Sequence, residues 1–144
     1  MSSFKIFDIA GSGLSAESVR LNTIASNLAN AESSSSDPAT VYKARHPVFQ
    51  AVRDALASFS TDPDAASGAA VRVGGIVESN APPTVTHDPG NPLADAQGNV
   101  YSPNVNIIEE MTDMISASRS YQDNVEIMNT SKDLMLDTLK LGQS

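Results

Sequence analysis

The chain has no cysteine and no tryptophan, and only four phenylalanines and three tyrosines supply aromatic side chains among its 144 residues. The absence of cysteine excludes disulfides, thiolate metal sites and cysteine nucleophiles. Because large rings are scarce, any core has to be built from aliphatic side chains, methionine and alanine. This composition favours an elongated molecule over a globular one.

Positive charge is also scarce, because nine Lys and Arg stand against seventeen Asp and Glu, for a formal net charge of −8. Binding to nucleic acid phosphates requires clustered Lys and Arg. The nine cations of this chain are scattered along its length. We therefore expect neither nucleic acid nor anionic lipid surfaces as partners.

Long hydrophobic runs are absent as well, since no window approaches the roughly 18 consecutive apolar residues of a membrane span. Near the start of the chain, Asp8, Gly11 and Ser12 interrupt the apolar residues that a secretory signal would need. We expect a soluble chain that does not span a membrane and is made without a cleaved signal peptide.

The sequence offers little from which a catalytic site could be built. Its two histidines, His46 and His87, lie in separate stretches and have no ligand partner at helical spacing. The acidic group Glu109, Glu110 and Asp113 is better explained as a solvated first helical turn, which the helix dipole favours, than as a metal site. We predict a protein that is not an enzyme, with no cofactor, metal or small-molecule substrate.

A long helix is predicted at the C-terminal end, because the 38 residues from 104 to 141 contain neither proline nor glycine. Such a helix would be roughly 57 Å long. Either Ser102 with Pro103 or Asn106 with Glu109 could begin it, and Lys140 and Gly142 are typical stop signals. Heptad spacing relates Ile107, Met111, Met114, Ser118, Tyr121, Val125, Met128, Lys132, Met135 and Leu139.

A second helix is predicted from about residue 4 to residue 30. Gly11 and Gly13 weaken its first turns, each by about 1 kcal/mol relative to alanine. The serine-rich segment 32–40 should end it. The heptad stripe of this helix consists of Phe7, Ala10, Leu14, Leu21, Ile24, Leu28 and Ala31.

Between these helices lie all eight prolines of the chain, from Pro38 to Pro103. We expect strand character at 41–48, a short helical turn at 48–59 and a loop at 60–70. A strand at 71–77 could pair with 84–87 as a small hairpin, and 88–99, rich in turn residues, should be an extended connector.

These patterns together predict a mainly α fold with a small β-rich middle. A short hairpin or extended insert should lie between the two long helices. The predicted domain division is 1–34 for the first helix, 35–101 for the middle and 102–144 for the second helix.

Four side chains in the middle of the C-terminal stripe are polar where a hydrophobic seam would carry leucine or isoleucine. They are Ser118, Arg119, Tyr121 and Asn124. Polar residues at a seam fix register and partner at some cost in stability. The alternative is that Arg119 and Asn124 simply face water.

The residues at both ends resemble the terminal signatures of the bacterial flagellar axial proteins, which form the rod, the hook and the hook-associated structures. The N-terminal signature consists of Gly13-Leu14-Ser15-Ala16, Arg20-Leu21-Asn22 and Ser26-Asn27-Leu28-Ala29-Asn30-Ala31. The C-terminal signature consists of Asn104-Val105-Asn106, Glu110-Met111, Met114-Ile115, Ser118-Arg119-Ser120-Tyr121, Asn124-Val125 and Leu139-Lys140-Leu141-Gly142. The short middle, with Phe49-Gln50 and the connector Asp88-Pro89-Gly90-Asn91-Pro92-Leu93-Ala94-Asp95, is most similar to proximal rod members of this family.

This resemblance implies a structural subunit that polymerises in the periplasm into a helical, torque-transmitting tube required for motility. It implies that the two long helices pair as an antiparallel coiled coil, and that the chain is exported through the flagellar type III apparatus. It implies as partners further copies of the chain, other proximal and distal rod proteins, and the hook-basal body base protein. The alternatives are another flagellar axial protein or a soluble helical secretion chaperone or adaptor.

The expected assembly interface lies on both terminal helices. It comprises Phe7, Leu14, Leu21, Ile24, Asn27, Leu28, Asn30, Ile107, Met111, Met114, Ser118, Arg119, Tyr121, Asn124, Val125, Met128, Met135 and Leu139.

Overall fold

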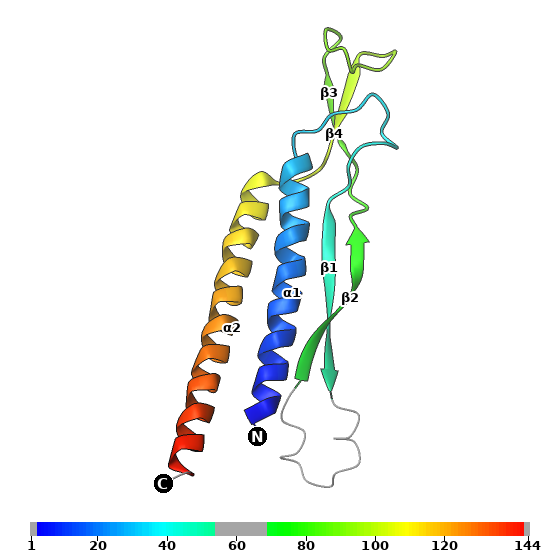
Figure 1. Ribbon diagram of the computed structural model, residues 1–144. Helices are drawn as coiled ribbons and strands as arrows, with labels where there is room; N and C mark the ends of the chain where they lie inside the picture. Colours follow the sequence, from blue (N-terminus) through cyan, green and yellow to red (C-terminus); the bar gives the residue numbers. More distant parts are fainter. Residues whose placement is uncertain (1–2, 54–68, 143–144) are drawn as a thin grey trace. The chain divides into compact units, whose positions relative to one another are not determined.

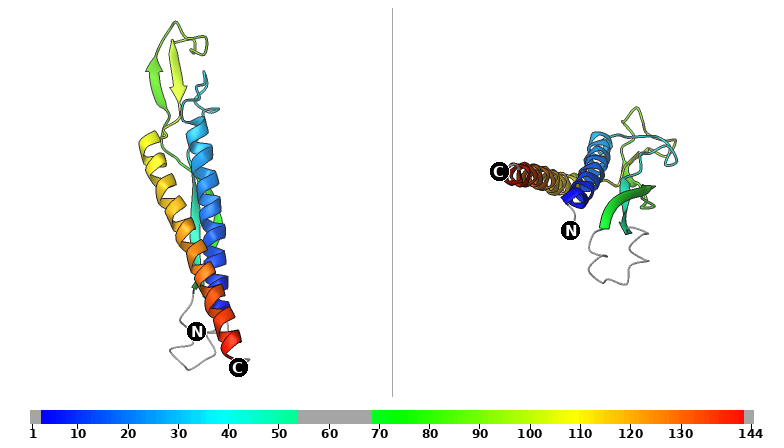
Figure 2. Two further views of the ribbon diagram at one scale, coloured as in Figure 1. Left: turned by 60° about the vertical axis from the view of Figure 1, so that its left-hand side comes forward. Right: turned by 60° about the horizontal axis from the view of Figure 1, so that its bottom comes forward.

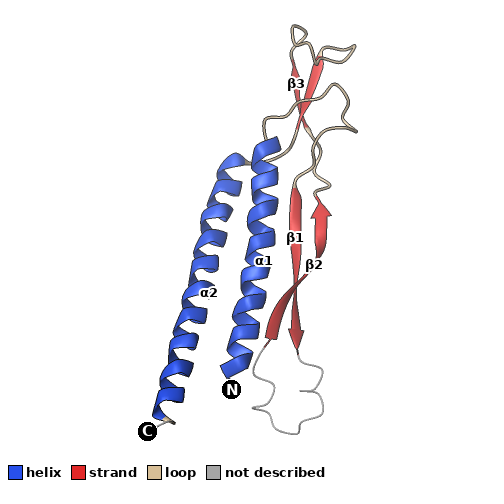
Figure 3. Ribbon diagram, viewed as in Figure 1, coloured by secondary structure: helices blue, strands red, loops and turns tan. Residues whose placement is uncertain are grey.

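A computed structural model describes residues 3–53 and 69–142 of the chain. Long helices stand at both ends and short strands lie between them, which confirms the prediction of a mainly helical fold with a small β middle (Figures 1 and 3). In order, the elements are α1 (Ser3–Asn30), β1 (Arg45–Arg53), β2 (Ala69–Glu78), β3 (Thr84–His87), β4 (Asn99–Ser102) and α2 (Ile107–Leu141).

The structure divides into two compact units, and each is made of segments that are far apart in the sequence. Unit 1 consists of Met1–Val19, Val48–Gly75 and Ala117–Ser144, and unit 2 of Arg20–Pro47 and Ile76–Ser116. Each unit therefore contains part of α1 and part of α2, and within each the two helical segments run antiparallel (Figure 2). The domain division at residues 34 and 101 stays a prediction.

The ends of both helices follow the capping chemistry of their sequences. Asn106 is the N-cap of α2, because its Oδ1 accepts hydrogen bonds from the backbone N–H groups of Ile108 and Glu109, at 3.1 and 3.4 Å. This decides between the two predicted starts. At the other end, Gly142 N donates to Thr138 O at 3.1 Å, and α1 stops at Asn30, just before the serine-rich segment.

The strands pair differently from the prediction. β2 lies beside β1, and β3 pairs with β4 in an antiparallel hairpin whose register joins Thr84 to Ser102 and His87 to Asn99. The predicted pairing of 71–77 with 84–87 is therefore wrong. Local sequence favoured the nearest strand, whereas the true partner of β3 lies beyond the turn-rich connector.

The structure also differs from the predicted helical turn at 48–59 and from the predicted loop at 60–70. A helical turn at 48–59 is wrong for 48–53, which are strand, because Val48, Phe49 and Val52 suit an extended chain. The rest of that segment, and the predicted loop at 60–68, lie outside the described residues. Residues 69 and 70, which the loop prediction included, open β2.

The connector between β3 and β4 is organised by the carboxylate of Asp95. Its Oδ1 accepts hydrogen bonds from the backbone N–H groups of Gln97 and Asn99, both at 2.8 Å, and its Oδ2 accepts from the Tyr101 hydroxyl at 3.0 Å. These bonds, chiefly the one from Asn99 N, lower the pKa of Asp95 from its ordinary value of 3.8. The bond to Asp95 in turn raises the pKa of Tyr101. Gly98 supplies the left-handed backbone (φ 79°) that the turn requires.

The buried apolar side chains are aliphatic, as the lack of aromatic residues predicted, and more than half of them are alanine. The buried apolar residues of the described chain are Ala10, Ala16, Ile24, Val41, Ala44, Val100 and Ala117. Small residues allow helices to approach closely, but each contributes little apolar area. Many large apolar side chains, particularly on α2, are instead exposed.

Candidate assembly interface

Asn27 lies at the centre of a buried polar cluster in unit 2, and its side chain is 1% exposed. Its Nδ2 donates to the backbone carbonyl of Arg45 at 2.9 Å and to Glu110 Oε1 at 2.8 Å. Its Oδ1 accepts from Arg45 N and from the Tyr42 hydroxyl, both at 2.9 Å. All four hydrogen bonds that an amide side chain can make are present, so this buried polar group is fully satisfied.

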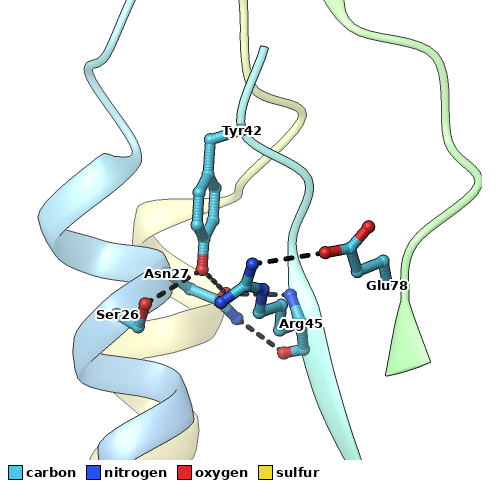
Figure 4. A network of polar contacts seen from close by, with 5 residues as sticks. All are labelled: Ser26, Asn27, Tyr42, Arg45 and Glu78. Atoms are coloured by element: carbon cyan, nitrogen blue, oxygen red, sulfur yellow. Dashed lines mark hydrogen bonds and ion pairs between the residues drawn. The ribbon is translucent and has the colours of Figure 1, made fainter. Parts of the chain in front are cut away.

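The same cluster joins α1 to the segment that leads into β1 (Figure 4). The Tyr42 hydroxyl is also 3.2 Å from Ser26 Oγ. The Arg45 guanidinium lies 5.7 Å from the centroid of the Tyr42 ring, and it forms a 3.3 Å ion pair with Glu78 at the end of β2. One asparagine thereby positions α1, the start of β1 and the first turn of α2 relative to each other.

A second contact between the helices in unit 2 is the ion pair of Arg20 with Asp113, at 3.2 Å. Asp113 stands one turn after Glu110 on α2. The predicted acidic first turn of α2 is thus not simply solvated, because Glu110 is only 7% exposed.

In unit 1 the helices meet where Gly13 faces Asn124. A Cβ on Gly13 would lie 3.0 Å from Asn124 Nδ2, and that amide donates to Ser120 O at 2.9 Å. On another side of α1, the Ser12 hydroxyl accepts from Val71 N of β2 at 3.0 Å. In this unit too, α1 contacts both α2 and the β1–β2 sheet.

The buried side of α2 within the chain consists of small and polar residues. Glu110, Ala117 and Ser131 are its most buried members, and Asn124 is half-buried between them. Met114, Met128 and Met135 are also half-buried, and the other large apolar residues of α2 are exposed. The exposed ones on α2 are Ile107, Ile108, Met111, Ile115, Tyr121, Val125, Ile127, Leu134, Leu136, Leu139 and Leu141.

The predicted interface residues accordingly differ in their exposure. On α1, Ile24 and Asn27 are buried, and Phe7, Leu14, Leu21, Leu28 and Asn30 are half-buried. On α2, Met114, Ser118, Asn124, Met128 and Met135 are half-buried, whereas Ile107, Met111, Arg119, Tyr121, Val125 and Leu139 are exposed. Their burial between subunits stays a prediction.

Sequence reasoning missed Tyr42, Arg45 and Glu110 as partners of Asn27. The one available signal was Asn27 itself, an amide directly beside the apolar stripe of α1, which needs several partners if it is buried. Nothing in the local sequence identifies those partners, because they lie 15 to 83 positions away.

Within residues 3–53 and 69–142, no group of three or more histidine, aspartate or glutamate side chains is placed to hold a metal ion. Over the same residues, neither helix is long and apolar enough to cross a membrane. The buried polar cluster around Asn27 therefore stands out in this part of the chain because every hydrogen-bonding group of that side chain has a partner.

Two family models match the chain, one at each end. Residues 7–32 match the family described as flagella basal body rod protein, and residues 96–141 match the C-terminal family of the flagellar basal body rod FlgEFG proteins. The first match contains Asn27, and the second contains Glu110 and all of α2.

Curated relatives match the chain from end to end. The flagellar basal-body rod protein FlgC of Escherichia coli O6:H1 is 50% identical, with 99% of this chain and 100% of the relative covered. FlgC of Salmonella typhimurium is 49% identical and FlgC of Bacillus subtilis 31% identical, each over the same shares of the two chains.

Proposed function

The chain belongs to the FlgC family of flagellar basal-body rod proteins, and we propose that its copies pack through their terminal helices into a helical tube that transmits torque. As a family member it is a structural subunit of the flagellar basal body. Similarity to FlgC over the full length favours this function over another type of axial protein or a helical chaperone.

In the proposed rod, α1 and α2 pair as an antiparallel coiled coil. The neighbours are further copies, other proximal and distal rod proteins, and the hook-basal body base protein. The rod lies in the periplasm, and the subunit reaches it through the flagellar type III export apparatus without a cleaved signal peptide.

The observation that carries this proposal is the distribution of apolar residues around α2. Ile108 is 78% exposed, Ile115 56% and Leu139 63%, while the side that faces α1 holds small and polar residues. Large apolar side chains that are exposed in such numbers normally mark a surface that packs against another molecule. Neighbouring subunits can supply those elements, because a head-to-tail contact that does not close builds a helical assembly.

Polar residues on α2 would set the register of this packing. Ser118 and Asn124 are half-buried, and Asn124 lies against Gly13 of α1. Arg119 and Tyr121 are exposed and available to neighbours. We assign the intrachain register to the first pair and contacts between subunits to the second.

Replacing Ile115 with aspartate tests the proposal. Because Ile115 is exposed, Ile115→Asp should leave the far-UV circular dichroism of the isolated chain unchanged. In a strain lacking the native copy, it should abolish swimming and the recovery of the subunit in purified basal bodies.

The matched control is Ile115→Leu, which keeps an apolar side chain of similar volume and should preserve motility. Normal swimming of the Ile115→Asp strain would contradict packing through α2.

A further inference from the structure

β1 and β2 form a sheet of two strands, and among the described residues neither strand belongs to a larger sheet. Each strand therefore has an outer edge, where backbone N–H and C=O groups point away from its partner. Such an edge can pair with an extended segment of another chain, which leads to aggregation. β1 has nine residues and β2 has ten, so both edges are long.

In unit 2 the side-chain amide of Asn27 caps the outer edge of β1. Just before this strand, Ala44 O accepts from Ser79 N at 2.7 Å, so the backbone groups of Ala44 point toward the β2 side. Successive residues of an extended chain point their backbone groups to opposite sides, so those of Arg45 point away from β2. Arg45 N donates to Asn27 Oδ1, and Arg45 O accepts from Asn27 Nδ2, both at 2.9 Å. The amide thereby takes the place of a residue of a neighbouring strand.

Pro47 continues this protection along the same edge. It lies two residues after Arg45, so its backbone nitrogen is also on the outer side of β1. Proline has no N–H group and cannot donate to an added strand, which is why sheets accept it at their edges. In the part of β1 that belongs to unit 2, an incoming strand would find the groups of Arg45 occupied and no donor at Pro47.

In unit 1 the outer edge of β2 is capped by Ser12 of α1. Val71 N donates to Ser12 Oγ at 3.0 Å, so this N–H points to the helix and not to β1. The same hydroxyl donates to Ile9 O at 2.7 Å, which fixes its position on α1. Val71 is 37% exposed, so the N–H would be accessible to another chain if Ser12 did not occupy it.

We infer that α1 protects the β1–β2 sheet from pairing with an extended segment of a second copy, through Asn27 in unit 2 and Ser12 in unit 1. This role goes beyond the proposed function, because it concerns the isolated chain and does not depend on how the helices pack in a rod. Copies that come together to assemble carry identical strands, so wrong pairing between them is a hazard. Removal of a cap should therefore promote β aggregation more than the accompanying loss of stability does.

Growth of thioflavin T fluorescence in solutions of the isolated chain tests the inference. Asn27→Ala opens the edge of β1 and also destabilises the chain. The matched control is Ile24→Ala, because Ile24 is 4% exposed on the same helix and its truncation destabilises through a cavity while Asn27 stays in place. Compared at equal fractions of unfolded chain, Asn27→Ala should aggregate about tenfold faster. Equal rates would show that aggregation follows unfolding alone and would overturn the inference.

Ser12 provides a second test that does not depend on Asn27. Ser12→Ala removes the acceptor of the Val71 N–H, and alanine is well tolerated in a helix. Hydrogen exchange of the Val71 amide should become about tenfold faster, and thioflavin T fluorescence should grow faster with it. Ser12→Thr keeps the hydroxyl and should leave both rates at their native values.

Two outcomes of this second test would contradict the inference. Unchanged exchange at Val71 in Ser12→Ala would show that Ser12 does not cap the edge of β2. Faster exchange without faster aggregation would show that the open edge does not pair with a second copy.

Discussion

Asn27 uses every hydrogen-bonding group of its side chain within unit 2. Hydrogen bonds of this kind contribute modestly when made, but removing one partner leaves buried groups unsatisfied. The groups at stake are the backbone N–H and C=O of Arg45, the Tyr42 hydroxyl and the Glu110 carboxylate. At the residue scale, this is the position where a small change has the largest expected effect on stability.

Asn27→Ala should lower the free energy of unfolding by about 2–4 kcal/mol, because it removes partners from several buried polar groups at once. The measurement is urea denaturation of the isolated chain, followed by circular dichroism. Asn22→Ala changes an exposed asparagine of the same helix and should shift the free energy by less than about 0.5 kcal/mol. Equal effects of the two variants would show that the polar cluster contributes nothing.

The sequence could identify Asn27 as a residue of interest, but not its role. Its place beside an apolar stripe and within a recognisable motif marked it for the interface. Its partners could not be predicted, because Glu110 is 83 positions away and reads locally as part of an ordinary acidic first turn.

At the scale of elements, α1 contains two glycines with different surroundings. A Cβ on Gly11 would have nothing within 4 Å, whereas one on Gly13 would meet the Asn124 side chain at 3.0 Å. Both glycines cost about 1 kcal/mol in helix propensity. Of these two glycines, only Gly13 lies where a larger side chain would obstruct the close approach of α2.

Gly11→Ala should therefore stabilise the isolated chain by up to about 1 kcal/mol, raising its thermal midpoint. Gly13→Ala should stabilise it less or destabilise it, because the new Cβ would lie 3.0 Å from Asn124 Nδ2 and that side chain, which is bonded to Ser120 O, would have to shift. Thermal unfolding of the pair, followed at a helical wavelength, provides the comparison. An equal rise in both variants would mean that Gly13 and Asn124 are not in contact.

The helices were predictable from the sequence, because their heptad periodicity extends over many residues. The strand pairs were not, because each pair joins segments that are distant in the sequence. The heptad stripes predicted α1 and α2, with start and stop signals correct to within a few residues. The prediction of strand pairing failed because Val71–Val77 and Thr84–His87 have similar β propensity and nothing in their sequences specifies a partner. β4 was missed because Val100 and Tyr101 follow a cluster of turn residues.

At the scale of the whole molecule, the last turns of α2 have little to hold them in a single chain. From Leu136 to Gly142 every residue is exposed, and a short helical segment that buries little apolar surface is marginal in water. The segment Thr23–Asn27 is, in contrast, largely buried. Stability should differ accordingly along the chain.

Amide hydrogen exchange should show this difference. In the isolated chain, amides of 136–141 should exchange close to the unstructured rate, while those of Thr23, Ile24 and Asn27 are protected. In assembled basal bodies the same C-terminal amides should be protected as well, because neighbouring subunits cover them. Strong protection of 136–141 in the isolated chain would show that assembly is not needed to stabilise this end.

The Asn27 cluster also has a consequence for the order of events when the chain is made or moved from its N-terminal end. Its contributors, from Ser26 to Glu110, are spread over more than half of the sequence, and the Asn27–Glu110 bond alone spans 83 positions. Contacts of such wide sequence separation form late, since the loop between them must first be closed. The cluster therefore cannot be completed until the chain is present as far as Glu110.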